Sequence, residues 1–177
     1  MRPVGAELEI RPVCRSRARN LGSHWRGSME RCTLHRAMLQ SSSLHDIGTL
    51  SAAACEQARV RDHLIGAERS ARRRRPRLDP HTALCRALLL DELSHYRQRG
   101  RFPRNVARGT QPVPQIIDEH GTRCAVAHLM EISGQGELVR HIADTENDAR
   151  VHALARLPEL RAWLGAAGLS LDEAARI

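Results

Sequence analysis

One segment constrains the fold of this chain more than any other, because it carries the signals for both ends of a helix. It reads DPHTALCRALLLDELSHYRQRG and runs from Asp79 to Gly100. Asp79 is a favourable N-cap residue, Pro80 suits the first helical position, and Gly100 suits the position just past the end. The segment therefore predicts a helix that packs one face against a core. The large side chains of that face recur at helical spacing: Leu84, Leu88, Leu89, Leu93 and Tyr96.

The residues after Gly100 predict further short helices separated by turns. The segment RFPRNVARGTQPVP reads as a loop, and QIID after it is an apolar run that would fit one short strand or hairpin. Helical patterns follow at residues 122–133, 137–144, 148–157 and 158–168, the last one opened by Pro158 and running to Gly168. Ser170 with Glu173 forms a capping box for a last turn. We therefore expect an all-α fold, a compact bundle of about six short helices over residues 79–177.

Charge divides the chain into two parts. Residues 1–78 contain 16 Arg against 7 acidic residues, whereas residues 79–177 contain 12 Arg against 13. The first part has little sustained hydrophobic periodicity, so we expect a largely disordered, Arg-rich N-terminal segment with one helix at about residues 52–69. Translation from a later methionine would remove part of it.

The composition also bears on the cellular compartment. Every cation is Arg and none is Lys, which is typical of a GC-rich bacterial genome. The five Cys are widely spaced, and no apolar run approaches the roughly 18 residues of a membrane span. These features predict a reducing cytoplasm. The alternative is export as a lipoprotein, cleaved before Cys55 after a start at Met29 or Met38, but Asp46 and the serines before it disfavour such a signal.

Several segments together resemble a family of small bacterial proteins of unknown activity. The family has a Tyr-containing helix that leads to a Phe-Pro-x-Asn loop, an Asp-x-x-Gly-x-x-Cys-Ala-Val segment and a Trp-containing C-terminal helical hairpin. The match covers about residues 89–177. It supports a folded domain and singles out Cys124, but it implies no reaction. The positions that carry it are Tyr96, Phe102, Pro103, Asn105, Asp118, Gly121, Cys124, Asn147 and Trp163.

Cys124 is the first candidate for a catalytic residue. If the helix begins near Thr122, Cys124 lies in its first turn, where the helix end and the adjacent Arg123 would stabilise a thiolate. His128 and Glu131 follow at i+4 and i+7 on the same stripe, as a base and an orienting carboxylate would. Since Cys–His pairs usually come from separate elements, the favoured alternative is that Cys124 is a small buried residue and His128 a hydrogen-bonded one.

Two pairs of ligand residues suggest a zinc site. HTALC places His81 and Cys85 one helical turn apart, and CAVAH does the same for Cys124 and His128. If the two helices were neighbours, they would offer a tetrahedral set of two thiolates and two imidazoles. His120 with Cys124 and His128 is the other ligand set, although the glycine after His120 predicts that this residue lies in a turn.

Four residues are candidates for a polar binding site: Tyr96, Phe102, Asn105 and Asp118. Phe102 with Pro103 would pin the loop to the core, and Asn105 would satisfy backbone groups in it. A structural role for this loop is favoured, and the edge of a pocket is the alternative.

The run ARRRRPR concentrates positive charge at Arg72, Arg73, Arg74, Arg75 and Arg77. Such a run attracts nucleic acid or anionic lipid without sequence preference. It has no interleaved aromatic residues for base stacking, and no helix-turn-helix or zinc-finger pattern accompanies it. A solvated linker is the alternative.

Three hypotheses about function follow. The first is a binding or interaction domain in which Cys124 and His128 pack or anchor polar groups. The second is a thiol-dependent enzyme, and the third is non-specific nucleic-acid association through the Arg run. The first is favoured because no complete catalytic motif is visible, and the sequence leaves open whether the protein is an enzyme.

Overall fold

Helices dominate the structure, as the all-α prediction requires. The computed structural model describes residues 44–104, 106–108, 111–113 and 115–177. The disorder expected for residues 1–43 lies outside these ranges. Within them, six helices fall after residue 79, in agreement with the sequence, and one precedes it. The elements are α1 (Leu44–Arg73), α2 (Pro80–Arg99), β1 (Val106–Arg108), β2 (Gln111–Val113), α3 (Ala125–Ile132), α4 (Gly136–Glu146), α5 (Val151–Leu154), α6 (Pro158–Ala167) and α7 (Leu171–Arg176).

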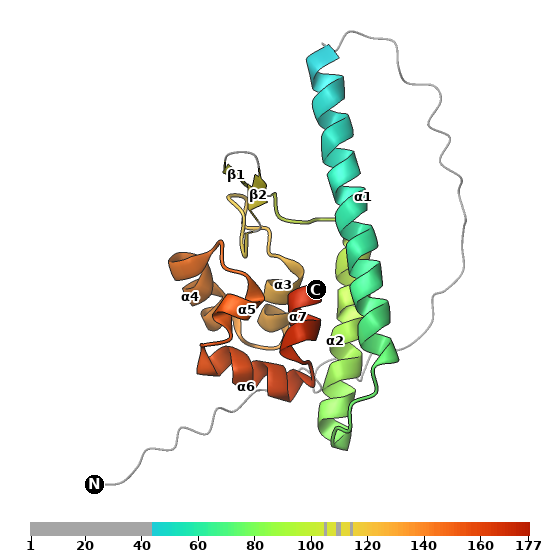
Figure 1. Ribbon diagram of the computed structural model, residues 1–177, viewed down its shortest axis with the longest axis vertical. Coiled ribbons are helices and arrows are strands. Elements are labelled where there is room, and N and C mark those ends of the chain that lie inside the picture. Colours follow the sequence, from blue (N-terminus) through green and yellow to red (C-terminus); the bar gives the residue numbers. More distant parts are fainter. Residues whose placement is uncertain (1–43, 105, 109–110, 114) are drawn as a thin grey trace.

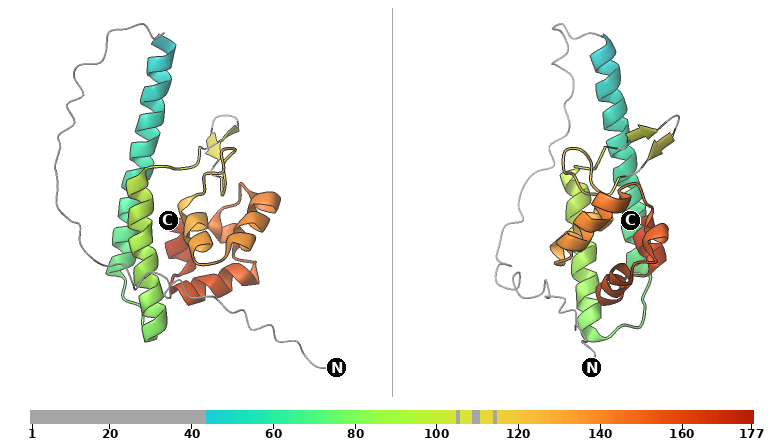
Figure 2. Two further views of the ribbon diagram at one scale, coloured as in Figure 1. Left: turned by 180° about the vertical axis from the view of Figure 1, so that it is seen from behind. Right: turned by 90° about the vertical axis from the view of Figure 1, so that its left-hand side faces the viewer.

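α1 and α2 form an antiparallel pair along one side of the molecule, and α3 to α7 gather against this pair (Figures 1 and 2). The N-terminal half of α1 extends away from the other helices (Figure 1). In its second half, Leu64, Ala67 and Ala71 are buried at helical spacing i, i+3 and i+7. Two expectations are thereby corrected. The helix expected at residues 52–69 is longer at both ends, and the packed unit begins within α1 rather than at Asp79.

The predicted helix-end signals act at α2, α6 and α7. The Asp79 carboxylate accepts two N–H groups of the first turn of α2, and Pro158 occupies the first turn of α6. Gly100 and Gly168 follow α2 and α6 in the left-handed conformation. The capping box of Ser170 and its N3 glutamate opens α7. These local signals therefore fix both ends of α2 and of α6, and the start of α7.

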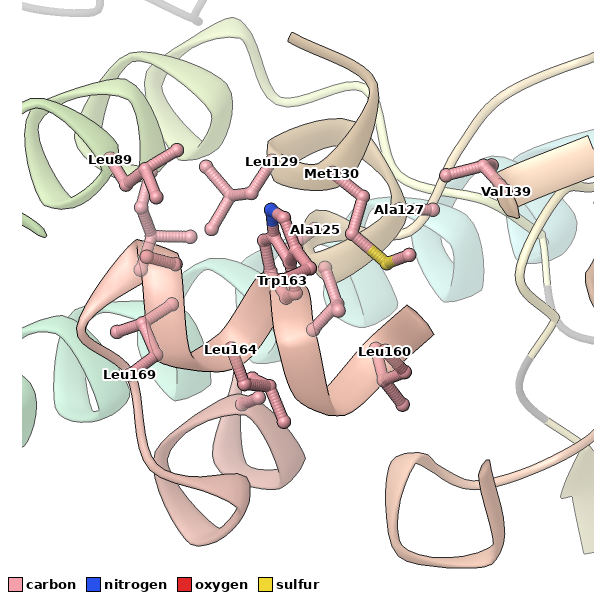
Figure 3. Close-up of a cluster of buried hydrophobic side chains, with 14 of the residues drawn as sticks. Leu89, Ala125, Ala127, Leu129, Met130, Val139, Leu160, Trp163, Leu164 and Leu169 are labelled. Atoms are coloured by element: carbon pink, nitrogen blue, oxygen red, sulfur yellow. The ribbon is translucent and has the colours of Figure 1, made fainter. Parts of the chain in front are cut away.

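Trp163 of α6 lies at the centre of the core, among leucines from α2, α3 and α6 (Figure 3). It is 2 % exposed. Its indole N–H donates to Ser133 Oγ at 2.8 Å, and this hydroxyl donates in turn to the carbonyl of Leu129 at 2.7 Å. The one polar atom of the indole is thus satisfied at the end of α3.

The fold prediction allowed one short strand or hairpin, and a hairpin is present, but it lies within residues 101–114, which the sequence predicted to be a loop. β1 and β2 pair antiparallel, with Val106 opposite Val113. In place of a strand at QIID, Ile117 forms an isolated antiparallel bridge with Arg123. Among the described helices, none combines the length and the hydropathy that crossing a membrane requires.

Candidate functional site

Cys124 ends the loop before α3 and caps the helix. Its φ and ψ of −64° and 167° are extended, and its Sγ accepts the N–H of Ala127 at 3.5 Å. Its own N–H donates to the carbonyl of Ile116 at 2.8 Å. α3 begins at Ala125 and not near Thr122, as expected from the sequence, because the bridge holds the preceding backbone extended. Cys124 is therefore an N-cap residue rather than a residue of the first turn.

The surroundings of Cys124 keep its thiol neutral. Burial raises the pKa of Cys124, and the opposing N–H groups of Ala127 and Val126 do not outweigh it. Arg123 does not supply a free positive charge, since its Nη2 lies 2.7 Å from Oε1 of Glu131. This environment disfavours the thiolate on which the enzyme hypothesis depends.

His128 packs against α2. Its Nε2 lies 3.1 Å from Oε1 of Glu92 and 2.8 Å from Nη2 of Arg99, and its ring stacks on Tyr96 with centroids 5.1 Å apart. A guanidinium only donates and a carboxylate only accepts. Nε2 therefore accepts from Arg99 when it carries no proton and donates to Glu92 when it does. The carboxylate beside His128 is Glu92, whereas the Glu131 of the proposed triad pairs with the arginine before Cys124.

Glu92 is the charged centre of this region, although it was not among the candidate residues predicted from the sequence. Burial opposes its ionisation, but hydrogen bonds from His128, Arg99 and His95 lower the pKa of Glu92 to about 2. Its side chain is 9 % exposed. A signal for it existed, because Glu92, Tyr96 and Arg99 recur at i, i+4 and i+7 on one stripe of α2.

Tyr96 and Phe102, two of the candidate binding residues, pack on each other. Their ring centroids lie 5.6 Å apart in a tilted arrangement. Tyr96 is 5 % exposed, and its hydroxyl donates to the carbonyl of Arg123 at 2.8 Å. Burial raises the pKa of Tyr96, so the phenol stays a donor. It ties α2 to the loop that ends at Cys124.

Asp118, the third candidate, organises that loop. Oδ1 accepts the N–H groups of His120 at 2.9 Å and Thr122 at 2.7 Å, and Oδ2 accepts that of Arg104 at 3.0 Å. Burial opposes ionisation, but these three donors lower the pKa of Asp118. One carboxylate thus joins the loop after α2 to the loop before α3. Asn105, the fourth candidate, lies outside the described residues.

Asn147 holds the same loop from the other side. Its Oδ1 accepts the N–H of Ile117 at 2.9 Å, and its Nδ2 donates to the carbonyl of Ile117 at 2.8 Å. The side chain therefore pairs with Ile117 as a neighbouring strand would. Positions that carry the family resemblance converge here, on the architecture of one loop: Tyr96, Asp118, Cys124 and Asn147.

The structure does not assemble the proposed zinc sites. Over the described ranges, no three His, Cys, Asp or Glu side chains form a group that could hold a metal ion. His81 and Cys85 lie near the start of α2. His128 instead contacts Glu92, which lies two helical turns, or about 10 Å along the helix, beyond Cys85, so the two ligand pairs do not meet. His120 is exposed in the turn before α3, with 56 % of its side chain accessible.

A second region of interest lies at the opposite end of α2, about 24 Å along the helix from Tyr96. A surface cavity of about 480 Å³ lies between residues 74–78 and the turn that joins α6 to α7. We call it the basic hollow. Its lining includes Leu78, Leu164, Leu169 and Gly165, together with the exposed Arg74 and Arg75. Leu164 and Leu169 are also core residues, labelled in Figure 3, so the hollow opens onto the edge of the core.

One arginine of the run beside the hollow forms ion pairs with other described residues. Arg72 pairs with Glu68 at 2.9 Å and with Asp91 at 2.8 Å. The other four are exposed, and no carboxylate in the described part of the chain forms an ion pair with them. They are Arg73, Arg74, Arg75 and Arg77.

A buried ion pair closes the inner side of the hollow. Arg86 and Glu173 are 6 % and 7 % exposed and make two hydrogen bonds, of 2.7 and 3.0 Å. Arg86 also donates to the carbonyls of Ala71 and Gly168. Burial opposes ionisation, but Arg86 lowers the pKa of Glu173. Because Arg86 neutralises the carboxylate that lines the hollow, the uncompensated charge there is positive.

Gly168 allows the two walls of the hollow to meet. Its φ is +64°, and a Cβ placed on it would lie 2.8 Å from Leu78 and 3.0 Å from Thr82. The Arg residues are recognisable in the sequence but the hollow is not, because its walls are about ninety residues apart in the chain. The only local signal was weak, namely the two glycines Gly165 and Gly168 around the end of α6.

No protein-family model matches the chain, and neither the curated proteins nor the solved structures give a significant match. The family resemblance of residues 89–177 therefore stays a prediction.

Proposed function

We propose that the protein is a binding module that recognises an acidic protein partner through Arg73, Arg74, Arg75 and Arg77. The observation that carries the proposal is the exposure of these four side chains without an ion pair to any carboxylate of the described residues. Charges of one sign repel one another within a fold, and a cluster of them steers an oppositely charged partner. Arg is also enriched in protein interfaces.

The surface next to the cluster favours a protein partner over nucleic acid. Beside the Arg residues, the lining of the hollow includes three aliphatic side chains, Leu78, Leu164 and Leu169, and no aromatic one. Single-stranded nucleic acid uses aromatic side chains as stacking platforms, and the phosphate backbone needs charge alone. An aliphatic surface beside the charge is useful to a partner that carries both carboxylates and apolar side chains.

The region around Cys124 and His128 supports the binding hypothesis rather than the thiol enzyme. Its thiol is a helix cap, and His128 is engaged by Glu92 and Arg99. We therefore propose no reaction. We place the protein in a reducing cytoplasm as part of the same proposal, which is consistent with the free thiols of Cys55, Cys85 and Cys124.

The proposal is tested with the full chain and a fluorescein-labelled oligoglutamate, by fluorescence anisotropy over a series of salt concentrations. We expect Arg74→Glu with Arg75→Glu to raise the Kd about tenfold or more, which corresponds to about 1.4 kcal/mol. The matched control is Arg140→Glu with Arg150→Glu, which changes the net charge equally at exposed positions of α4 and of the turn before α5. Since residues 1–43 are also basic, the difference between the two double variants is the measured quantity.

Two outcomes would reject the proposal. One is an equal loss of affinity in both double variants, which would make the binding a matter of net charge alone. The other is a DNA duplex that binds the full chain much more tightly than oligoglutamate at physiological salt and loses this affinity in Arg74→Glu with Arg75→Glu. That result would establish the nucleic-acid alternative.

A further inference from the structure

The basic hollow combines two features that a partner would have to match. Exposed Arg74 and Arg75 lie on its outer side, and buried Leu164 and Leu169 lie on its inner side. Its volume of about 480 Å³ falls in the range of roughly 300–1,000 Å³ that is usual for binding pockets. This is room for apolar side chains and not only for a counter-ion.

We propose that the hollow takes a leucine-sized aliphatic side chain of an acidic protein segment, while carboxylates of the same segment pair with Arg74 and Arg75. This inference rests on the proposed function and names the motif that the module recognises. Specificity arises because only a partner with both groups adjacent satisfies the charged and the aliphatic walls.

The net positive charge of the chain's own N-terminal segment disfavours it as the occupant. Residues 1–43 contain eight Arg and three acidic residues. A bilayer is not the occupant either. Membrane-surface proteins insert apolar side chains that protrude beside their basic residues. In the hollow, by contrast, Leu164 and Leu169 are each 5 % exposed, so the apolar group must come from the partner. The exposed leucines of α2, Leu84 and Leu88, do not line the hollow.

Gly165 provides a variant that tests the cavity without altering any charge. It lines the hollow, and a Cβ placed on it has no heavy atom within 4 Å. Gly165→Leu therefore fills the hollow from within a helix, where glycine is the less favourable residue. The matched control is Gly66→Leu on α1, another helical glycine whose Cβ would meet no atom within 4 Å.

The experiment compares two labelled peptides on the full chain by fluorescence anisotropy. Both have the same length and the same number of glutamates, and one carries leucines where the other carries serines. We expect the leucine peptide to bind about tenfold more tightly, because a buried leucine side chain contributes about 1.5–3 kcal/mol before ordering costs. Gly165→Leu should abolish this preference and Gly66→Leu should keep it. Thermal unfolding followed by circular dichroism verifies that both variants fold.

A second readout keeps the inference testable if Gly165→Leu fails to fold. In methyl NMR spectra of the wild-type protein, the leucine peptide should shift the resonances of Leu164 and Leu169, and the serine peptide should not. Equal affinity of the two peptides for the wild-type protein would overturn this inference and leave the proposed function standing. Binding of neither peptide would overturn both.

Discussion

The two ends of α2 differ in how their charges are satisfied. At the C-terminal end, Glu92, Arg99 and His128 form a network with one another, and Asp118 is saturated by backbone donors. At the N-terminal end, the buried pair of Arg86 and Glu173 is closed in the same way, but the arginines beside it point to solvent without a carboxylate partner among the described residues.

The difference shows that chemically versatile residue types do not by themselves mark a site. Cys124, His128 and Tyr96 were candidate site residues in the sequence, yet each side chain has a hydrogen-bond partner that gives it a structural role. The Arg run was only one of three candidates in the sequence and the leucines beside it were not candidates at all, yet the basic hollow is where the fold leaves charge next to apolar side chains. Four predictions test this contrast, in decreasing order of the expected effect.

The largest effect is expected from breaking the buried pair behind the hollow. Arg86→Met leaves Glu173 buried without its partner, which should lower the free energy of unfolding by about 3–5 kcal/mol. Urea denaturation measures the loss. Because replacing both partners by apolar residues removes the unpaired charge, Arg86→Met with Glu173→Leu should recover most of it. A double variant as unstable as the single one would contradict this account.

At the other end of α2, Asp118→Ala should be the most damaging change. It removes a carboxylate that accepts three N–H groups, so we expect a loss of about 2–3 kcal/mol, measured by urea denaturation. Glu119→Ala is the control. The side chain of Glu119 is next to Asp118 in the chain and is 78 % exposed, so its removal should be nearly neutral. An Asp118→Ala protein of wild-type stability would mean that the loop does not depend on this carboxylate.

Acid should weaken the network around Glu92. The folded-state pKa of Glu92 is about 2, below the ordinary value of 4.5. Ionised Glu92 therefore stabilises the fold fully above about pH 4.5, and this contribution is lost as the pH falls from about 4.5 to 2. The loss should be smaller than that of Asp118→Ala, because half-exposed Arg99 and His95 are screened by solvent. Thermal unfolding between these pH values should show a shallower fall in Tm for Glu92→Gln than for the wild type. Parallel curves would rule out Glu92 as the source.

The smallest effect is expected at Cys124. Serine is a good N-cap, so Cys124→Ser should change stability by less than about 1 kcal/mol. In the folded protein, iodoacetamide should modify exposed Cys55 well before Cys124, as mass spectrometry of timed samples would show. Faster alkylation of Cys124 near neutral pH would revive the thiol-enzyme hypothesis and remove the contrast between the two ends.

The parts of the fold that were predictable depend on local signals. Asp79, Gly100 and Gly168 act within one turn of their own positions, so they could be recognised in isolation. The start of α3 could not be placed, because it depends on the hydrogen bond that the Cys124 N–H donates to the carbonyl of Ile116 and on the Thr122 N–H that the carboxylate of Asp118 accepts.

The candidate site was harder to predict for the same reason. The contact of Glu92 with His128 spans 36 residues, and that of Arg86 with Glu173 spans 87. Spacing of i+4 and i+7 from Cys124 predicted Glu131 beside His128, whereas packing of α3 on α2 places Glu92 there. Only the exposed arginines could be found without the fold, since they depend on no partner within it.

The length of α1 sets a distance between two basic parts of the chain. Its 30 residues rise about 45 Å at 1.5 Å each, so Leu44 is held that far from Arg73 and the hollow. The arginines of residues 1–43 are attached at the Leu44 end. A short acidic peptide can therefore engage the hollow alone, whereas a segment of more than about 13 extended residues can reach both ends of α1. Under the proposed function, such a long partner would gain affinity from a second contact, because the linked contact is intramolecular.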